Sequence, residues 1–135
     1  MSESTNGAAR RSIDVAGTGH GAVPIPAASR IGNLVLTGAV YGRDPKTNAA
    51  VEGDAQQVAQ MFANLRALLD AAGAKPEHVI KLAISAKDLA IRDAINVEWL
   101  KMFPDADSRP ARHLAQYDHF PGATVICCEA YVVIG

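Results

Sequence analysis

An arginine between a proline and a strand-like run is the residue of this sequence best suited to bind an anion. The segment Ser108-Arg109-Pro110-Ala111-Arg112 leads into a predicted strand, and Pro110 restricts the backbone conformation on either side of it. Arg112 is therefore expected to project a planar, permanently charged guanidinium from a rigid element. Such a group binds a carboxylate through two parallel hydrogen bonds. The alternative is a solvated surface arginine, because most arginines are exposed.

The cysteines and histidines do not follow a metal-binding pattern. Cys127 and Cys128 are adjacent, so on a strand their side chains point to opposite faces and do not bond to each other. The four histidines are His20, His78, His113 and His119. Their positions lack the ligand spacing of a zinc site. We therefore expect two reduced thiols in a reducing compartment, no metal and a cytoplasmic location.

Composition predicts one globular domain. The chain has 135 residues, a net charge of -1 and 49% hydrophobic residues, which suffices for an aliphatic core. No basic block follows Arg10 and Arg11, which argues against a nucleic-acid partner. No apolar run approaches the roughly 18 residues that cross a bilayer. Residues 1–9 are polar and small and lack the apolar segment of a signal peptide. We expect a disordered tail over residues 1–10 and a single domain over 11–135.

Hydrophobic periodicity predicts the order β-β-β-α-β-α-β-β. The first three strands are one at 11–15 and the two of a hairpin whose turn runs into a buried strand within 31–38. A helix capped by Asp54 and ended by Gly73 precedes a strand at 79–85 with Ile80, Leu82 and Ile84 on one face. A helix capped by Asp88 and stopped by Phe103-Pro104 then precedes strands at 113–117 and 125–133. Two helices cover only one face of such a sheet, which predicts a two-layer α+β fold.

The last predicted strand is apolar on both faces. Ile126, Cys128, Ala130 and Val132 share one face, and Cys127, Tyr131 and Val133 share the other. Helices of this chain cover the first face, so the second needs a cover from outside the chain. Association of copies through the open sheet face meets this need.

The order and spacing of several short segments make the sequence similar to the RidA family, also called YjgF, from about Pro24 to Val133. The matching segments are Gly32–Gly38, Asp44–Thr47, Ala71–Gly73, the run from Val79 through Leu89, and Arg109–Arg112. The resemblance implies a chorismate-mutase-like fold and a homotrimer with a central barrel, outer helices and clefts between subunits. It also implies hydrolysis of reactive enamines or imines of 2-keto acids, with release of ammonia and without metal or cofactor.

Three positions match residues to which the family gives a role at the cleft. Arg112 matches the arginine that clamps the substrate carboxylate. Asn96 matches an asparagine that reaches the cleft from a neighbouring subunit. Thr37 and Gly38 fall where a Ser-Gly pair offers backbone polar groups to the ligand.

Other positions depart from the family pattern. Leu114 replaces a cysteine, Ile25 an aromatic residue and Gly122 a frequent lysine, which implies a more apolar cleft and a bulkier substrate. Cys127 replaces the glutamate that orients the hydrolytic water, and Glu129 matches only a second glutamate of that strand. Catalysis therefore requires Glu129 or Cys127 to manage the water.

Two functions follow from this resemblance. The first is a RidA-type deaminase of a small carboxylate-bearing imine or enamine, with Glu129 and Cys127 as catalytic candidates. The second is a non-catalytic protein that binds a small acid or acts as a regulator or chaperone, in which Glu129 makes only inter-subunit contacts. His113 is expected to face away from Arg112 in a structural role, and His119 to lie in a solvated loop.

Overall fold

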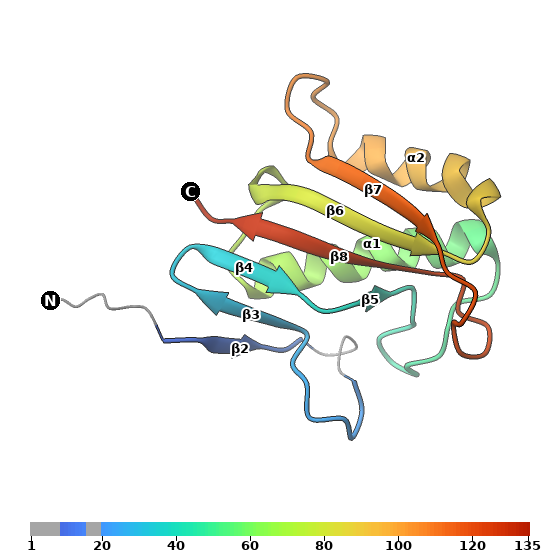
Figure 1. The fold of residues 1–135 in the computed structure, drawn as a ribbon, viewed down its shortest axis with the longest axis horizontal. Coiled ribbons are helices and arrows are strands. Elements are labelled where there is room, and N and C mark those ends of the chain that lie inside the picture. Colours follow the sequence, from blue (N-terminus) through green and yellow to red (C-terminus); the bar gives the residue numbers. More distant parts are fainter. Residues whose placement is uncertain (1–8, 16–19) are drawn as a thin grey trace, which may run out of the picture.

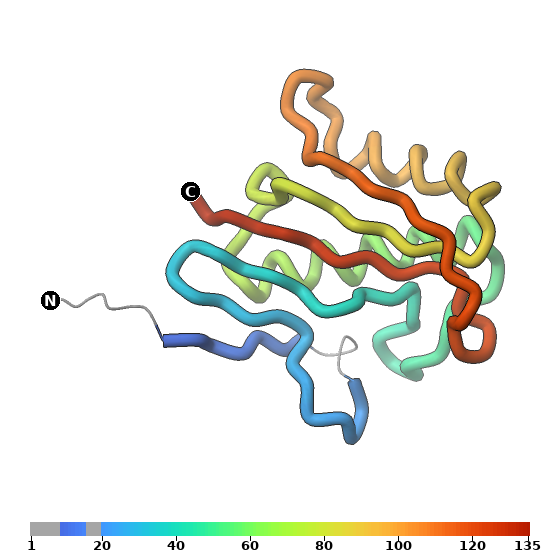
Figure 2. Tube along the Cα trace, in the orientation of Figure 1, coloured from blue at the N-terminus to red at the C-terminus, as the bar shows by residue number. Residues whose placement is uncertain are grey.

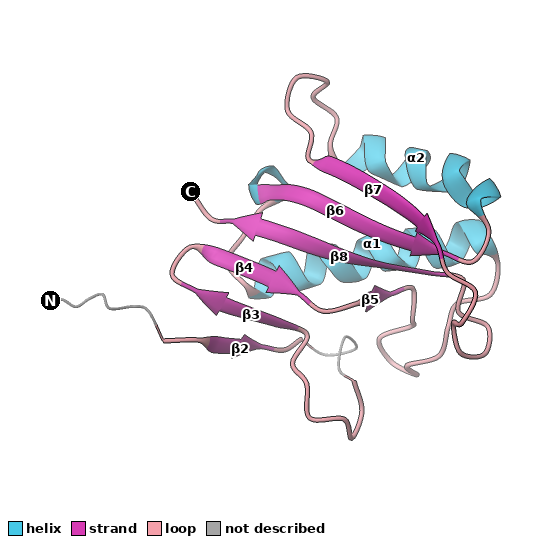
Figure 3. Ribbon diagram, in the orientation of Figure 1, coloured by secondary structure: helices cyan, strands magenta, loops and turns pink. Residues whose placement is uncertain are grey.

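The computed structural model describes residues 9–15 and 20–135, so most of the predicted tail lies outside the described residues. One seven-stranded sheet has the order β2-β3-β4-β8-β6-β7, with β5 paired to β8. The elements are β2 (Arg11–Ile13), β3 (Ala28–Ile31), β4 (Leu34–Thr37), β5 (Val40–Tyr41), α1 (Asp54–Ala71), η1 (Pro76–His78), β6 (Val79–Ala86), η2 (Leu89–Ile91), α2 (Arg92–Met102), β7 (Ala111–Gln116) and β8 (Ile126–Val133). Both helices lie on the same face of this sheet (Figures 1 and 3). The two-layer α+β prediction is thereby confirmed.

Helix α1 forms because its apolar residues recur at helical spacing. The buried stripe includes Val58, Met61, Phe62 and Leu65, which pack against the sheet. Gly73 follows the helix with φ of 74°, as predicted for the residue that ends it. The prediction that Asp54 caps the start of α1 was wrong.

Gly53, with φ of 90°, occupies the N-cap position of α1, and its backbone carbonyl accepts from Gln57 N at 2.8 Å. Asp54 is instead the first helical residue and makes no capping hydrogen bond. An aspartate there still interacts favourably with the positive end of the helix dipole.

The second helical segment begins with a tighter turn than predicted. Asp88 accepts a hydrogen bond from Ala90 N at 2.9 Å and so caps η2, and α2 begins only at Arg92. Ile91, Ile95 and Met102 are buried, and the partly buried Trp99 packs against the core beside them. This packing fixes α2 beside the edge strand β7.

Strand β6 contains an irregularity that the sequence pattern does not reveal. Val79 pairs with Val132 and Lys81 with Tyr131, so the pairing register shifts at Ile80. Ile80 is 61% exposed, whereas Leu82 and Ile84 are buried. The prediction that all three share one face was therefore wrong for Ile80, because an extra residue in one strand reverses the alternation locally.

The sheet face away from the helices has no covering layer among the described residues. Leu34 pairs with Val133 and Leu36 with Tyr131, and all four are exposed. In the Cα trace, β4 and β8 run side by side on the side of the sheet that faces the viewer (Figure 2). The predicted open face is thereby present. Among the described residues, no helix is long and apolar enough to cross a membrane.

Two buried amides join α1 to the loops around the sheet. Gln57 Nε2 donates to Val51 O at 3.0 Å and Ala123 O at 3.1 Å, and its Oε1 accepts from Val125 N at 2.7 Å. Asn64 Nδ2 donates to the carbonyls of Tyr41 and Arg43 at 2.9 and 2.8 Å. These bonds fix the entry into β8 and the exit from β5.

We predict that Gln57→Leu lowers the free energy of unfolding by about 3 kcal/mol, because it removes three partly buried hydrogen bonds between the Gln57 amide and the backbone. Denaturant unfolding at a fixed protein concentration measures the change. Gln56→Leu, at the exposed neighbouring position, is the control and should change stability by less than about 0.5 kcal/mol. Equal effects of the two variants would contradict this role of Gln57.

Candidate active site

Arg112 lies on β7, on the sheet face that carries the helices. It pairs in register with the buried Leu82 and is half-buried. Its Nη1 donates to Asn96 Oδ1 at 2.9 Å, and its Cζ lies 4.9 Å from the centre of the Trp99 ring. Both contacts come from α2. The guanidinium is thus held in one orientation, and donors other than Nη1 remain for a ligand.

The surroundings of Arg112 are unfavourable for its positive charge, and a bound anion would stabilise that charge. Burial lowers the pKa of Arg112, and the neighbouring Arg92 lowers it further. Arginine nevertheless remains charged in proteins, so the lowered pKa reflects an unfavourable environment for the cation. A carboxylate between these groups would offset the repulsion between the two arginines and compensate for the burial of the Arg112 charge.

Asn96 and Leu114 adjoin Arg112 in the same chain. Leu114 is the next residue of β7 on the same face and packs against the core. Asn96 is bonded to the arginine of its own chain, whereas the resemblance implied a contribution from a neighbouring subunit. The pairing of Asn96 with Arg112 therefore belongs to one subunit.

Glu129 and Cys127 lie on the opposite, open face of the sheet. In the β6–β8 ladder Glu129 pairs with Ala83 and Cys127 with Ser85, and Cys127 also pairs with Tyr41 of β5. Glu129 is exposed and Cys127 half-buried. The structure therefore does not bring either residue to Arg112 within one chain, since the sheet lies between them.

The Thr37-Gly38 segment is already engaged in backbone hydrogen bonds. Thr37 Oγ1 accepts from Ala130 N at 2.9 Å and donates to Gly38 O at 2.8 Å. Gly38 N donates to Ala27 O at 2.8 Å, so this N–H is not free for a ligand. Ile25, 54% exposed, lies in the loop before β3, and strands β4, β8 and β6 separate β3 from β7.

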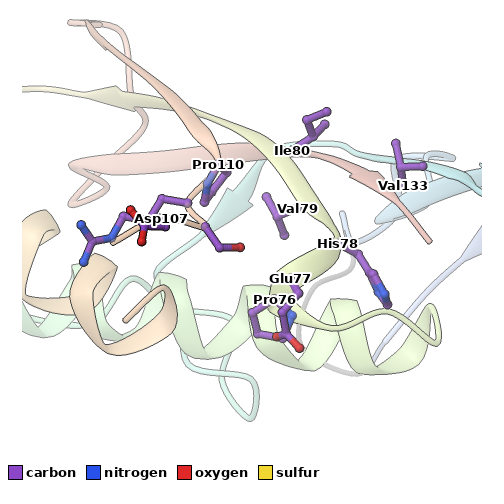
Figure 4. A pocket seen from close by; sticks show the side chains of 10 residues that line it. Pro76, Glu77, His78, Val79, Ile80, Asp107, Pro110 and Val133 are labelled. Atoms are coloured by element: carbon purple, nitrogen blue, oxygen red, sulfur yellow. The ribbon is translucent and has the colours of Figure 1, made fainter. Parts of the chain in front are cut away.

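The first arginine of the motif has a structural role. Arg109 Nε donates to Phe103 O at 2.9 Å and Nη2 to Pro104 O at 3.4 Å, which ties the loop before β7 to the end of α2. Arg109 also lines a pocket of about 290 Å³ with Glu77, His78 and Asp107 (Figure 4). This pocket contains none of the candidate site residues.

The histidines of the last third of the chain take the predicted places. His113 is exposed and pairs with Ala83, so it faces away from Arg112, on the same face as Glu129. His119 is exposed in the loop after β7, where its ring lies 5.7 Å from that of Tyr117. Among the described residues, no three His, Cys, Asp or Glu side chains form a group that could hold a metal ion.

Comparison with known proteins agrees with the fold and with the motifs. The model of the endoribonuclease L-PSP family, which includes the RidA proteins, matches residues 22–134. The chain belongs to the RidA family. A RidA structure from a Psychrobacter species has a TM-score of 0.83 at 27% identity, with 92% of this chain and 99% of that chain covered.

Two curated relatives carry names at different levels of detail. A 2-iminobutanoate/2-iminopropanoate deaminase of Salmonella typhimurium is 30% identical over 104 residues, which cover 76% of this chain and 81% of the relative. A RutC family protein of Aquifex aeolicus is 36% identical over 81 residues, which cover 60% of this chain and 64% of the relative.

In this member of the RidA family, the cysteine at the expected glutamate position is a weak acid. Burial, and then the nearby charge of Glu129, raise the pKa of Cys127 to about 11, although hydrogen bonding with Ser85 acts in the opposite direction. Burial raises the pKa of Cys128 as well. Cys127 is therefore a neutral thiol near neutral pH and not a base for water.

Sequence reasoning missed two residues beside Arg112. The Trp99 ring lies against the guanidinium of Arg112, and Arg92 is near enough to lower the pKa of Arg112. Arg92, Asn96 and Trp99 stand at i, i+4 and i+7 of one helix, so the helical period placed all three on one face. The family motif had singled out only Asn96.

We predict that the rate of alkylation of Cys127 by iodoacetamide rises about tenfold per pH unit up to about pH 11, because only the thiolate reacts. A Cys128→Ala background assigns the signal to Cys127. The folded pKa exceeds the ordinary 9.0, so this thiol's contribution to stability is full below about pH 9 and decreases up to about pH 11. A rate that levels off by pH 9 would contradict the raised pKa.

Proposed function

We propose that this chain is a RidA-type deaminase that hydrolyses a small, carboxylate-bearing imine or enamine. In the reaction water adds to the C=N carbon, the C–N bond breaks, and a keto acid and ammonia leave. The observation that supports this best is Arg112, held half-buried by Asn96 and Trp99 with donors remaining. The name of the Salmonella relative points to the same chemistry.

The proposed site is formed between copies of the chain. Arg112 and Glu129 lie on opposite faces of one sheet, so one subunit contributes Arg112 with Asn96 and Leu114, and a neighbour contributes Glu129. A homotrimer with a central barrel also covers the exposed apolar residues of the open face. The same assembly thus accounts for the open face and for the division of the site.

In this proposal Glu129 is the general base. Cys127 is a neutral thiol near neutral pH, whereas Glu129 carries a carboxyl group, a common proton acceptor in catalysis. Glu129 is exposed on the open face of the single chain, and the proposed assembly places it at the cleft between subunits. Cys127 then lines the site next to Glu129 without taking a proton.

The alternative is a non-catalytic protein that binds a small acid or regulates a partner. The neutral thiol at position 127 favours it, because the water-orienting carboxylate of the family is missing there. Arg112 would bind a carboxylate equally well in either function. Catalytic measurements on variants of Glu129 and Cys127 distinguish the two.

We predict a trimer in solution, with about three times the 14.2 kDa of the chain. Sedimentation equilibrium at micromolar concentration measures the mass. Leu36→Glu, on the open face, should weaken the assembly because it places a charge among apolar residues that the proposed trimer would bury. A stable wild-type monomer would reject the inter-subunit site.

We predict that Arg112→Lys lowers affinity for small 2-keto acids by about 30-fold or more, because a lysine cannot form two parallel hydrogen bonds with a carboxylate. Isothermal titration calorimetry measures the change. Arg66→Lys, at an exposed position of α1, is the control. Unchanged affinity in Arg112→Lys would exclude this residue as the carboxylate clamp.

We predict that Glu129→Gln lowers the rate of imine hydrolysis by roughly 10² to 10⁴, the usual size for a positioned general base, while keto-acid affinity is retained. The amide has nearly the same shape but accepts no proton. Cys127→Glu should raise activity on simple 2-imino acids if it is folded by circular dichroism. Background rates for wild type and both variants across a panel of imines would favour the binding protein.

A further inference from the structure

A second arginine stands beside the proposed carboxylate clamp. Arg92, Asn96 and Trp99 follow one face of α2 at i, i+4 and i+7. The last two contact the Arg112 guanidinium directly. Arg92 therefore continues the same stripe by one turn, about 6 Å along the helix axis from Asn96. The stripe runs beside β7, where Leu114 follows Arg112 on the same face.

No partner among the described residues explains the position of Arg92. It is exposed and makes no hydrogen bond or ion pair with the described residues, where Lys101 and Glu98 form the ion pair of α2. It is the first residue of α2, where the helix dipole disfavours a cation. It also lies close enough to Arg112 to lower the pKa of that residue. An anion between the two guanidinium groups would reduce this unfavourable charge.

We infer that the substrate carries a second anionic group, as in a 2-imino dicarboxylic acid, and that Arg92 binds this group while Arg112 binds the carboxylate next to the imine. The inference rests on the proposed function, and it makes Arg92 a residue that determines specificity. Leu114 packs against the core beside Arg112 and offers the carbon chain of the substrate an apolar wall. A monocarboxylate with an apolar side chain would use Leu114 alone and gain nothing from Arg92.

The test compares wild type with Arg92→Gln, Arg92→Lys and the control Arg66→Gln, which removes the same charge from an exposed position of α1. Amino-acid oxidases generate the imines of aspartate and glutamate, and those of alanine and 2-aminobutanoate. Their decay in competition with semicarbazide gives kcat/KM.

Arg92→Gln should lower kcat/KM about 5-fold or more for the dicarboxylates, and less than about 2-fold for the monocarboxylates. Arg92→Lys should retain most of the dicarboxylate activity, and Arg66→Gln should leave the ratio unchanged. The preference for dicarboxylates should also decrease as salt rises, since the added contact is between charges. Equal losses for both substrate classes, or no loss, would overturn the inference.

Binding of the product keto acids separates this inference from the proposed function. Titration calorimetry with 2-oxoglutarate and 2-oxobutanoate requires no catalysis. If no imine is hydrolysed, the deaminase proposal fails, yet tighter binding of 2-oxoglutarate that Arg92→Gln abolishes would still support the inference. Equal affinity of the wild type for the two keto acids would overturn it whether or not the protein is an enzyme.

Discussion

Side-chain alternation along β8 is the constraint on which the candidate site depends. Ile126, Cys128, Ala130 and Val132 are almost fully buried under the helices, which places Cys127 and Glu129 on the other face. Arg112 lies on the helix side of β7, at the sheet edge. In the proposed function Arg112 is the carboxylate clamp and Glu129 the base, and their place on opposite faces of one sheet keeps them apart within one chain. The proposed assembly between chains follows from this geometry and from the apolar open face together.

The helices hold the clamp in place as well as covering the core. Ile95 and Met102 fix α2 against the sheet, and the same helix presents Asn96 and Trp99 to Arg112. Orientation before the ligand binds reduces the entropy that binding must otherwise remove from a long side chain. On the open face Glu129 is not held by any comparable hydrogen bond among the described residues. Its final orientation therefore depends on the neighbouring subunit in the proposed trimer.

Local patterns in the sequence predicted the helices and strands. The features that they did not predict depend on contacts between segments that lie far apart in the sequence. The stripe of α1 and the glycine after it follow from residues within a few positions of each other, so both were predictable. The exposure of Ile80 depends on how β6 pairs with β8, about fifty residues later in the chain, and the sequence pattern of β6 contains no sign of it. The bonds of Arg112 to α2 likewise join separate elements. The motif identified Arg112, but only the fold shows Trp99 and Arg92 around it.

The proposal that Glu129, and not the residue at position 127, is the base bears on the size of the substrate. Two residues along a strand separate these side chains by about 6.6 to 6.8 Å, so a base at Glu129 acts on a different point of the cleft. If Arg112 keeps the carboxylate, the reacting carbon and its water must still lie within hydrogen-bond reach of the base. A small imine such as 2-iminobutanoate offers few atoms with which to adjust its position. A longer substrate that is also held by Arg92 has a second point of attachment, and two attachments determine the direction in which its reacting carbon faces. The arginine at position 92 beside Arg112 and the cysteine at position 127 are thus consistent with one feature, a cleft fitted to a longer and more anionic substrate.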